Sequence, residues 1–343
     1  MSQSIIHIAR KTLPRIALLI CFGFLFQWVY KTTFWRSDLK LHAKMLDELL
    51  VIQDTCDILY FAESSNFTNH PDDSLPYSIS EFIAEGMPDK RVGTINHGAY
   101  HAGLFKNLIA QIDTTSPVKT VIVTMNVRTF NQDVIFGDDE ANLQMSNRFY
   151  IPAPPLLNRL FVSLNYYDDC SAHERDILLW NAWTYDTIKS DVDTIVFIPN
   201  TIRRWCEVDK FLDSNGVPNN HLRFLADQNI KAYAFKITEE NPMIHSFDAI
   251  CSIANQKGFD LVFNLMAENV EQADSVVGSN LIYLMRKNRD FLVDRYTNKG
   301  VLVVDNLETI GNTHFLDRER FPTEHYDMYG RQKIARNVLN FMR

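Results

Sequence analysis

Short runs of β-branched and aromatic residues alternate along this chain with longer stretches of helical spacing, and this alternation limits the fold more than any other feature. Strands are predicted at 57–61, 118–124, 194–198, 231–235, 260–264 and 301–304. Helices are predicted at 104–112, 175–189, 247–257, 281–296 and 328–342. Apolar strands separated by helices indicate a parallel sheet covered on both faces. We therefore expect an α/β fold, a three-layer α/β/α sandwich with a mainly parallel central sheet.

Composition excludes several classes of protein. A hydrophobic fraction of 46% and a charged fraction of 22% are typical of a globular chain. The net charge of −8 argues against nucleic acid as the main partner. No P-loop, no GxGxxG after a strand and no HExxH motif is present, so neither a nucleotide cofactor nor a metal is expected. The five cysteines form no CxxC pair, which leaves both disulfides and free thiols open.

An apolar segment near the N-terminus predicts a membrane anchor. Between Arg15 and Lys31, Gln27 is the one strongly polar residue. A helix over 13–35 would reach about 34 Å, enough to cross a hydrocarbon core of about 30 Å. No small-residue cleavage site follows, which favours an uncleaved signal anchor over a cleaved signal peptide. The basic N-terminal segment 1–12 is then cytoplasmic, and the body lies beyond the inner membrane, in the periplasm or outside the cell.

The remaining chain is expected to form one domain behind a linker. Leucines at helical spacing predict a linker helix within 36–54, and the domain follows at 55–343. An insertion at about 138–183 is rich in aromatic residues, proline and leucine. Such a stretch forms either an exposed apolar patch for a membrane protein or acyl chain, or an ordinary packed subdomain helix.

Residues that carry chemistry follow the predicted strands, where ligands of parallel sheets bind. A hydroxyl on a strand-to-helix turn can act as a nucleophile, and a histidine can act as its general base. A glycine N–H and an asparagine amide can hold an oxyanion. Helix caps, Asx turns and exposed histidines use the same residue types. In chain order the candidates are Ser64, Ser65, His97, Gly98, His101, Asn126, Arg128 and, before the last helix, His325.

Taken together, four short blocks resemble the SGNH (GDSL-type) hydrolases, whose name lists serine, glycine, asparagine and histidine. The blocks are Ala62-Glu63-Ser64, Asn96-His97-Gly98, Thr124-Met125-Asn126-Val127, and His325 with Gly330-Arg331. The resemblance spans about 56–343 and implies an SGNH-hydrolase or flavodoxin-like sheet. It implies Ser64 as the nucleophile and His325 as the base. It also implies Asn126 and Gly98 as oxyanion donors, and substrate contacts are expected from His97, His101 and Arg128.

Two positions depart from the family pattern. The family usually has Asp three residues before the histidine, and here that residue is Pro322. The acid that orients His325 is then Asp317, Glu319 or Glu324, or it is absent. Ser65 competes with Ser64 as nucleophile or contacts substrate, and alignment on the usual Gly-Asp-Ser favours Ser64.

An anchor followed by such a body resembles the membrane-anchored partners of membrane-bound O-acyltransferases. These act in D-alanylation of lipoteichoic acid and in O-acetylation of alginate. The resemblance implies an acyl-ester hydrolase or O-acyltransferase that acts on a cell-envelope glycan or polymer through a Ser-His acyl-enzyme, with such a membrane partner. A non-catalytic structural or binding subunit of an envelope complex, and an esterase that works alone, remain the alternatives.

Overall fold

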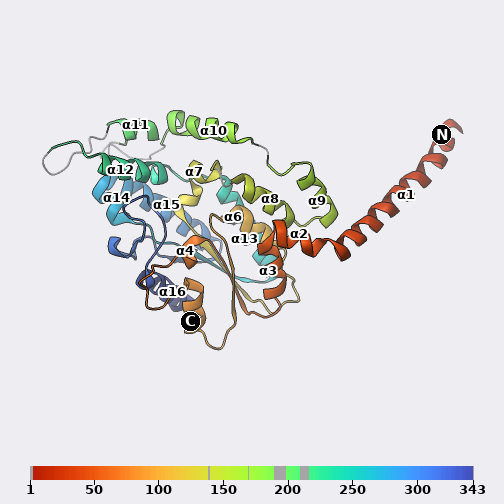
Figure 1. Cartoon of the computed structure of the whole chain (residues 1–343), viewed down its shortest axis with the longest axis horizontal. Coiled ribbons are helices and arrows are strands. Elements are labelled where there is room, and N and C mark those ends of the chain that lie inside the picture. Colours follow the sequence, from red (N-terminus) through yellow and green to blue (C-terminus); the bar gives the residue numbers. More distant parts are fainter. Residues whose placement is uncertain (1–2, 138–139, 169, 189–197, 209–215, 343) are drawn as a thin grey trace.

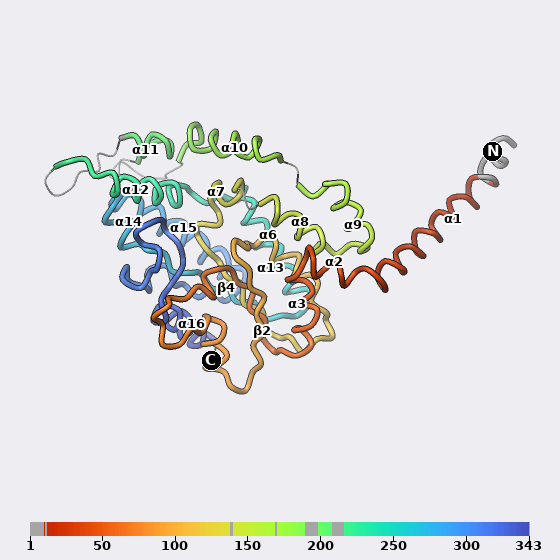
Figure 2. The backbone as a smooth tube through the Cα atoms, in the orientation of Figure 1, coloured from red at the N-terminus to blue at the C-terminus, as the bar shows by residue number. Residues whose placement is uncertain are grey.

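The computed structural model describes residues 3–137, 140–168, 170–188, 198–208 and 216–342. Within these residues the chain forms an α/β body from which one long apolar helix, α1 (Gln3–Thr33), projects. Figures 1 and 2 show this helix leading the N-terminus away from the body. Its segment Thr12–Thr33 is long and apolar enough to cross a membrane, and most of it is exposed, apart from its last turns, where Tyr30 is buried.

Five parallel strands form the central sheet in the order β2-β1-β3-β4-β5. They are β1 (Ile58–Ala62), β2 (Val92–Asn96), β3 (Thr120–Met125), β4 (Asp260–Leu265) and β5 (Leu302–Asp305). This is a doubly wound order, in which the chain changes direction across the sheet between β1 and β3. The carboxyl ends of β1 and β3 therefore lie on either side of the point where such sheets bind ligands.

The predicted sheet is confirmed in four of its six strands. The runs at 57–61, 118–124, 260–264 and 301–304 are β1, β3, β4 and β5. The strand predicted at 231–235 is wrong, because residues 231–233 are the last turn of α12 (Asn220–Tyr233). Buried residues recur along that helix at a spacing of four, and this helical period prevails over the short apolar run. The strand predicted at 194–198 lies almost entirely outside the described residues.

The predicted helices lie close to their predicted positions. The predicted helices at 104–112, 175–189, 247–257, 281–296 and 328–342 correspond to α6 (Ala102–Ala110), α10 (Ala172–Tyr185), α13 (Pro242–Lys257), α15 (Ser279–Asn298) and α16 (Met328–Met342). The start of α10 is set by a capping box between Ser171 and Glu174, and α13 ends at Gly258 in the left-handed conformation.

The other helices are short. They are α4 (Ser64–Phe67), α5 (Ile79–Gly86), η1 (Val127–Phe130), α7 (Gln132–Ile135), α8 (Glu140–Tyr150), α9 (Pro155–Ser163), α11 (Ile202–Val208), α14 (Val270–Val276) and η2 (Asn312–His314). Of these, α8 and α9 together with α10 fall within the predicted insertion at about 138–183.

The linker contains two helices instead of the single one predicted within 36–54. They are α2 (Trp35–His42) and α3 (Lys44–Ile52), and the chain breaks between them at Ala43, where φ is −146° and ψ is 46°. The break turns the chain so that Leu39 before it and Leu46 after it are both buried in the body.

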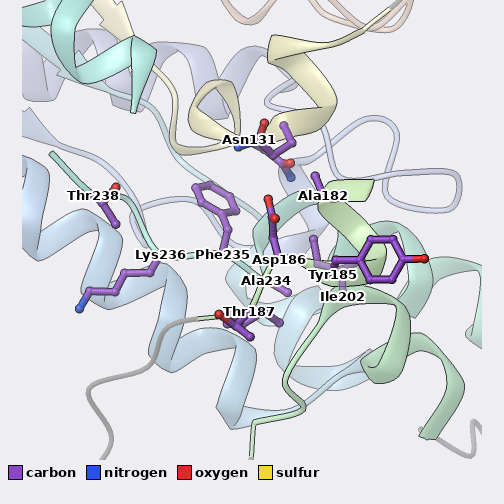
Figure 3. A pocket seen from close by; sticks show the side chains of 12 residues that line it. Asn131, Ala182, Tyr185, Asp186, Thr187, Ile202, Ala234, Phe235, Lys236 and Thr238 are labelled. Atoms are coloured by element: carbon purple, nitrogen blue, oxygen red, sulfur yellow. The ribbon is translucent and has the colours of Figure 1, made fainter. Parts of the chain in front are cut away.

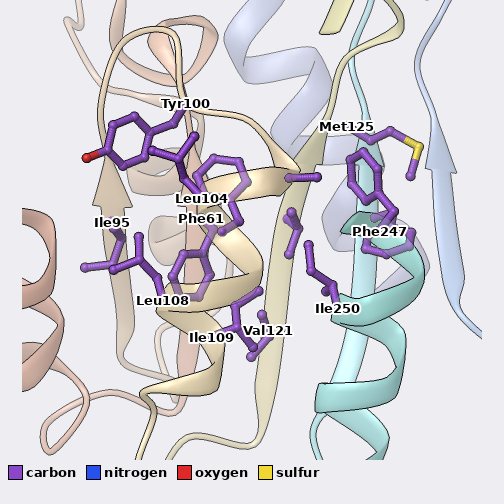
Figure 4. Close-up of a cluster of buried hydrophobic side chains, with 14 of the residues drawn as sticks. Phe61, Ile95, Tyr100, Leu104, Leu108, Ile109, Val121, Met125, Phe247 and Ile250 are labelled. Atoms are coloured by element: carbon purple, nitrogen blue, oxygen red, sulfur yellow. The ribbon is translucent and has the colours of Figure 1, made fainter. Parts of the chain in front are cut away.

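Alternate residues of β1 face two separate hydrophobic cores. Leu59 and Phe61 belong to a core that includes residues of α3, α6 and α13, part of which is drawn in Figure 4. Ile58 and Tyr60 belong to a second core with residues of α5 and α16. Full burial of an apolar side chain is worth about 1.5–3 kcal/mol, so these two cores hold the sheet rigidly between helices. A rigid sheet gives the residues at its carboxyl edge fixed positions.

Candidate active site

Ser64 is the second residue after β1, directly following Glu63, and it begins the short helix α4. Its turn is fixed by the side chain of Asn66, whose Oδ1 accepts a hydrogen bond from the Ser80 N–H at 2.9 Å. Thr68 donates from its hydroxyl to the carbonyl oxygen of Ser64 at 2.8 Å. Ser64 is partly exposed, whereas Ser65 is fully buried. The turn therefore presents Ser64 at the edge of the sheet and directs Ser65 into the protein.

His325 and Asp317 complete a hydrogen-bonded chain that begins at Ser64. His325 Nε2 lies 3.0 Å from Ser64 Oγ, and His325 Nδ1 lies 2.7 Å from Asp317 Oδ2. An ionised carboxylate can only accept, so Nδ1 carries the ring proton and Nε2 is free to accept the proton of Ser64. Thr323 donates a further hydrogen bond to Asp317 Oδ2 at 3.2 Å. This serine–histidine–carboxylate order is that of a catalytic triad.

The loop between β5 and α16 brings the acid and the histidine together. It folds back on itself through an antiparallel bridge between Phe315 and Tyr326, and the Leu316 N–H donates to the carbonyl of His325 at 2.9 Å. The Tyr326 hydroxyl then donates to the carbonyl of Ala267, beyond β4, at 2.7 Å. The bridge holds Asp317 opposite His325, so the acid is supplied from eight residues before the histidine instead of three.

Asn126 and Gly98 lie at the same edge of the sheet as Ser64. Strand β1 pairs with β3 at Phe61 and Val123, and three further residues along each strand are Ser64 and Asn126. Strand β1 pairs with β2 at Ala62 and Asn96, and two residues further are Ser64 and Gly98. The register therefore places these three predicted residues just beyond the carboxyl ends of three neighbouring strands.

The side-chain amide of Asn126 is free to act as a hydrogen-bond donor. Its Oδ1 accepts from the Arg128 N–H at 3.3 Å, which turns Nδ2 the other way. Nδ2 is buried and makes no hydrogen bond of normal geometry to the described residues, although it lies close enough to Glu324 to help lower the pKa of that carboxyl. A buried N–H₂ without an acceptor is costly unless a ligand supplies one.

Glu63 is part of the Ala62-Glu63-Ser64 block, but the sequence analysis gave it no role in the reaction. It is 5% exposed, and its Oε2 lies 3.1 Å from Ser64 Oγ. Burial and the nearby negative charge of Glu324 raise the pKa of Glu63. Ser64 Oγ is the donor in its contact with Glu63 Oε2, so Glu63 and His325 are alternative acceptors for the one hydroxyl proton, and a neutral Glu63 is the weaker competitor.

Two more buried carboxyls lie near this edge. Glu324 is paired with Arg128 through two hydrogen bonds of 2.9 and 2.8 Å. Burial would raise the pKa of Glu324, but the Arg128 guanidinium outweighs it and holds that pKa at about 2. Glu268, after β4, accepts from the Tyr233 hydroxyl at 2.6 Å, and burial together with Glu324 raises its pKa well above the usual range. Arg128 is partly exposed, but its guanidinium is paired with Glu324.

The remaining predicted residues are His97, His101 and Glu319, and the structure gives each of them other contacts or an exposed position. His97 is exposed, and its Nδ1 lies 2.7 Å from the carbonyl of Gly98. His101 is buried at the start of α6, where its Nδ1 accepts from the Gly103 N–H and its Nε2 lies 3.1 Å from Glu140. Glu319 is exposed, and no hydrogen bond or ion pair of its side chain is recorded for the described part of the chain.

Two residues near the site were missed by the sequence analysis. Glu268 follows a predicted strand, so the rule that selected Asn126 could also have selected it. Tyr233 was assigned to a strand that is a helix, which hid its position. The hydrogen bond from Thr323 to Asp317 could not be predicted from the sequence either, because it depends on the folded loop.

A polar cleft of about 1000 Å³ lies beside the acid of the triad. It is lined by the segment from Thr68 to Asp73, by Thr313, by the segment from Phe315 to Arg320, which includes Asp317, and by Asp327. A second pocket, of about 450 Å³ and drawn in Figure 3, is lined by residues near Asn131, Tyr185 and Lys236 and by none of the triad residues. Within the described residues, no group of three or more His, Cys, Asp or Glu side chains could hold a metal ion.

The arrangement has the parts that acyl transfer needs. A hydroxyl faces an imidazole whose other nitrogen is fixed by a carboxylate, and an unpaired amide lies at the neighbouring strand end. No protein-family model matches the sequence, and no curated protein matches it.

Proposed function

We propose that this protein is a membrane-anchored serine hydrolase or O-acyltransferase of the SGNH type. The observation that carries the proposal is the chain from Ser64 Oγ through His325 to Asp317, with contacts of 3.0 and 2.7 Å. The four residues that carry the resemblance all lie at one edge of the sheet, beside the point where its strand order reverses. They are Ser64, Gly98, Asn126 and His325. Two cores on opposite faces of β1 support a three-layer α/β/α arrangement as part of the same proposal.

The reaction begins with attack of Ser64 Oγ on an acyl carbonyl carbon while His325 Nε2 takes the hydroxyl proton. The resulting oxyanion is held by Asn126 Nδ2 and by the backbone N–H groups of Gly98 and Ser64. Collapse releases the alcohol, which receives the proton from His325, and leaves an ester on Ser64. Water or a glycan hydroxyl then attacks that ester, and the proton that it gives to His325 returns to Ser64 Oγ.

The anchor and the partner belong to the same proposal. The apolar helix α1 would cross the inner membrane, with the N-terminus inside and the body outside. An acyl donor delivered by a membrane-bound O-acyltransferase, and a glycan or polymer as acceptor, then suit an enzyme held at the membrane surface.

A fluorophosphonate probe tests the proposed nucleophile. The full-length protein in detergent is treated with the probe, and labelled peptides are mapped by mass spectrometry. We expect one label at Ser64, its loss in Ser64→Ala, and a decrease of at least about 10³-fold in labelling rate in His325→Ala.

Ser65→Ala is the matched control, because Ser65 is adjacent but fully buried, and the serine oxygen that His325 Nε2 meets is that of Ser64. It should be labelled at the wild-type rate. A folded protein that takes no label at Ser64, both in detergent and in native membranes, would contradict the enzymatic proposal and favour a binding or structural role.

A further inference from the structure

Helix α9 is attached to the apolar helix α1, and the attachment lies inside the apolar segment. The Leu156 N–H, in the first turn of α9, donates a hydrogen bond of 2.9 Å to Gln27 Oε1. Gln27 belongs to the segment Thr12–Thr33 that is long enough to cross a membrane. Figures 1 and 2 show α9 beside the end of α1 that joins the body.

A second set of contacts fixes α9 from the other direction. Arg159 Nε lies 3.0 Å from Asp38 Oδ2, and the Tyr30 hydroxyl donates to the same oxygen at 2.6 Å. Asp38 is in α2 and Tyr30 is in α1, so the three helices are joined through one carboxylate. The position of α9 relative to the apolar segment is therefore determined by polar contacts on both of its sides.

The outer side of α9 is apolar and uncovered. Leu157 and Leu160 of α9 and Leu164, the residue that caps its C-terminal end, recur at a spacing of three and four residues and are 40%, 50% and 66% exposed. Between residues 151 and 167 the sequence holds one charged residue, Arg159, which is already paired with Asp38. An exposed leucine stripe with no free charge is unusual on a face that meets water.

We infer that the leucine face of α9 (Leu157, Leu160 and Leu164) inserts into the outer interface of the lipid bilayer that α1 crosses. This inference rests on the proposed membrane anchor. Gln27 lies six residues before Thr33, so a helix rise of 1.5 Å per residue puts the contact with α9 about 9 Å inside the outer end of the segment. Amphipathic helices at membrane surfaces bury their apolar faces by about 5–10 Å.

Lipid is the occupant that the geometry favours over a partner protein. The depth of α9 is set by its own hydrogen bond to Gln27, so the leucine face meets the bilayer whether or not another protein is bound. Tyr166, which is 67% exposed just beyond the helix, is the residue type that gathers at the boundary between lipid and water.

Depth-dependent fluorescence quenching tests the inference on the full-length chain. A small environment-sensitive fluorescent amino acid is placed at position 160, 19 or 224, and each protein is inserted into nanodiscs that contain lipids with a nitroxide near either end of the acyl chain. Leu19 is 70% exposed in the middle of α1, and Phe224 is 45% exposed on α12, far from α1 in Figure 1. Each labelled chain is first shown to unfold at the wild-type temperature.

We expect the nitroxide near the headgroup to quench position 160 several-fold more strongly than position 224. The nitroxide near the methyl end should quench position 19 best. Quenching at 19 with none at 160 above the level at 224 would overturn the inference and leave the anchor intact, with a protein as the better occupant of the leucine face. No quenching at 19 would show that the anchor itself is wrong, and the inference would fail with it.

Discussion

The carboxyl edge of the sheet and the start of α6 each hold a histidine against a carboxylate, and they use the ring in opposite ways. At the carboxyl edge of the sheet, His325 turns Nδ1 toward Asp317 and Nε2 toward Ser64. At the start of α6, His101 turns Nε2 toward Glu140, and its Nδ1 accepts from a backbone N–H. The first ring therefore carries its proton on Nδ1, and the second carries it on Nε2.

The difference shows why a histidine–acid pair is not by itself a site. His101 uses both nitrogens within the protein, and its side chain is 2% exposed, so it has nothing to offer a substrate. A third pair, His314 and Asp327, has the same 2.7 Å contact as the triad, but its ring stacks on Tyr329. What distinguishes His325 is an acceptor nitrogen that meets a partly exposed hydroxyl.

Asp317→Asn should give the largest change in this comparison. An asparagine amide can donate to Nδ1, which moves the ring proton to Nε2 and gives His325 the tautomer of His101. The labelling rate of Ser64 with a fluorophosphonate should then fall by about 10⁴-fold. Stopped assays over a range of probe concentrations would measure this rate.

Asp327→Asn is the matched control, because it alters the pair with His314. Asp327 Oδ1 accepts from the Gly330 N–H at the start of α16, and an asparagine oxygen can do the same. We expect an unchanged labelling rate and a loss of stability of about 0–1 kcal/mol, since the pair is partly exposed. Equal decreases in the two variants would mean that the triad geometry has no special role.

Asn126→Ala should decrease the labelling rate by about 10²–10³-fold, because it removes one oxyanion donor. Asn131→Ala provides the comparison, since Asn131 caps α7 in the way that Asn126 caps η1. The Nδ2 of Asn131 is already bonded to the carbonyl of Ala232 at 2.8 Å, so its loss should affect stability and leave labelling unchanged. A similar loss of labelling in both variants would indicate that labelling depends on the helix caps of η1 and α7 and not on an oxyanion donor.

His101→Ala should affect stability instead of labelling. The change removes the N-cap of α6 and one of the two hydrogen-bond partners of the buried Glu140, which together should cost about 1–3 kcal/mol. Denaturant unfolding of the full-length protein in detergent would measure this cost. If His101→Ala instead remained stable and lost labelling, His101 would be the general base and His325 would have the structural role.

Sequence reasoning succeeded where the position of a residue depends on the sheet. Ser64 and Asn126 follow predicted strands, whereas Gly98 follows β2, which was not among the predicted strands; parallel pairing places the ends of all three strands at one edge. It left the acid open because Asp317 reaches His325 only through the bridge between Phe315 and Tyr326, a contact within a loop that has no periodic pattern.

The sequence analysis assigned His325 as the base and His101 as a substrate contact, but it could not predict which acid each ring meets. Each histidine lies beside its acid only after folding. The carboxylate of Glu140, 39 residues away, determines the tautomer of His101. The chemistry of an imidazole is therefore decided by contacts that are distant in the sequence, whereas the placement of a strand-end residue is decided locally.

Glu63→Gln should produce the smallest change in rate and a distinct change in pH dependence. Glu63 contacts the same Ser64 oxygen that faces His325, and its environment also contains Glu324, Arg128 and the Tyr60 ring. Its pKa is raised, so the neutral acid persists above the usual range and is lost as the pH rises through that higher value. Once ionised, Glu63 accepts the Ser64 proton and competes with His325 for it.

The labelling rate of the wild-type protein should therefore fall as the pH rises through the raised pKa of Glu63, while the rate of Glu63→Gln should show no such decline, because a neutral amide cannot ionise. At lower pH the two rates should agree within about threefold. A decline that survives in Glu63→Gln would assign it to another group, and Glu63 would then only shape the turn that presents Ser64.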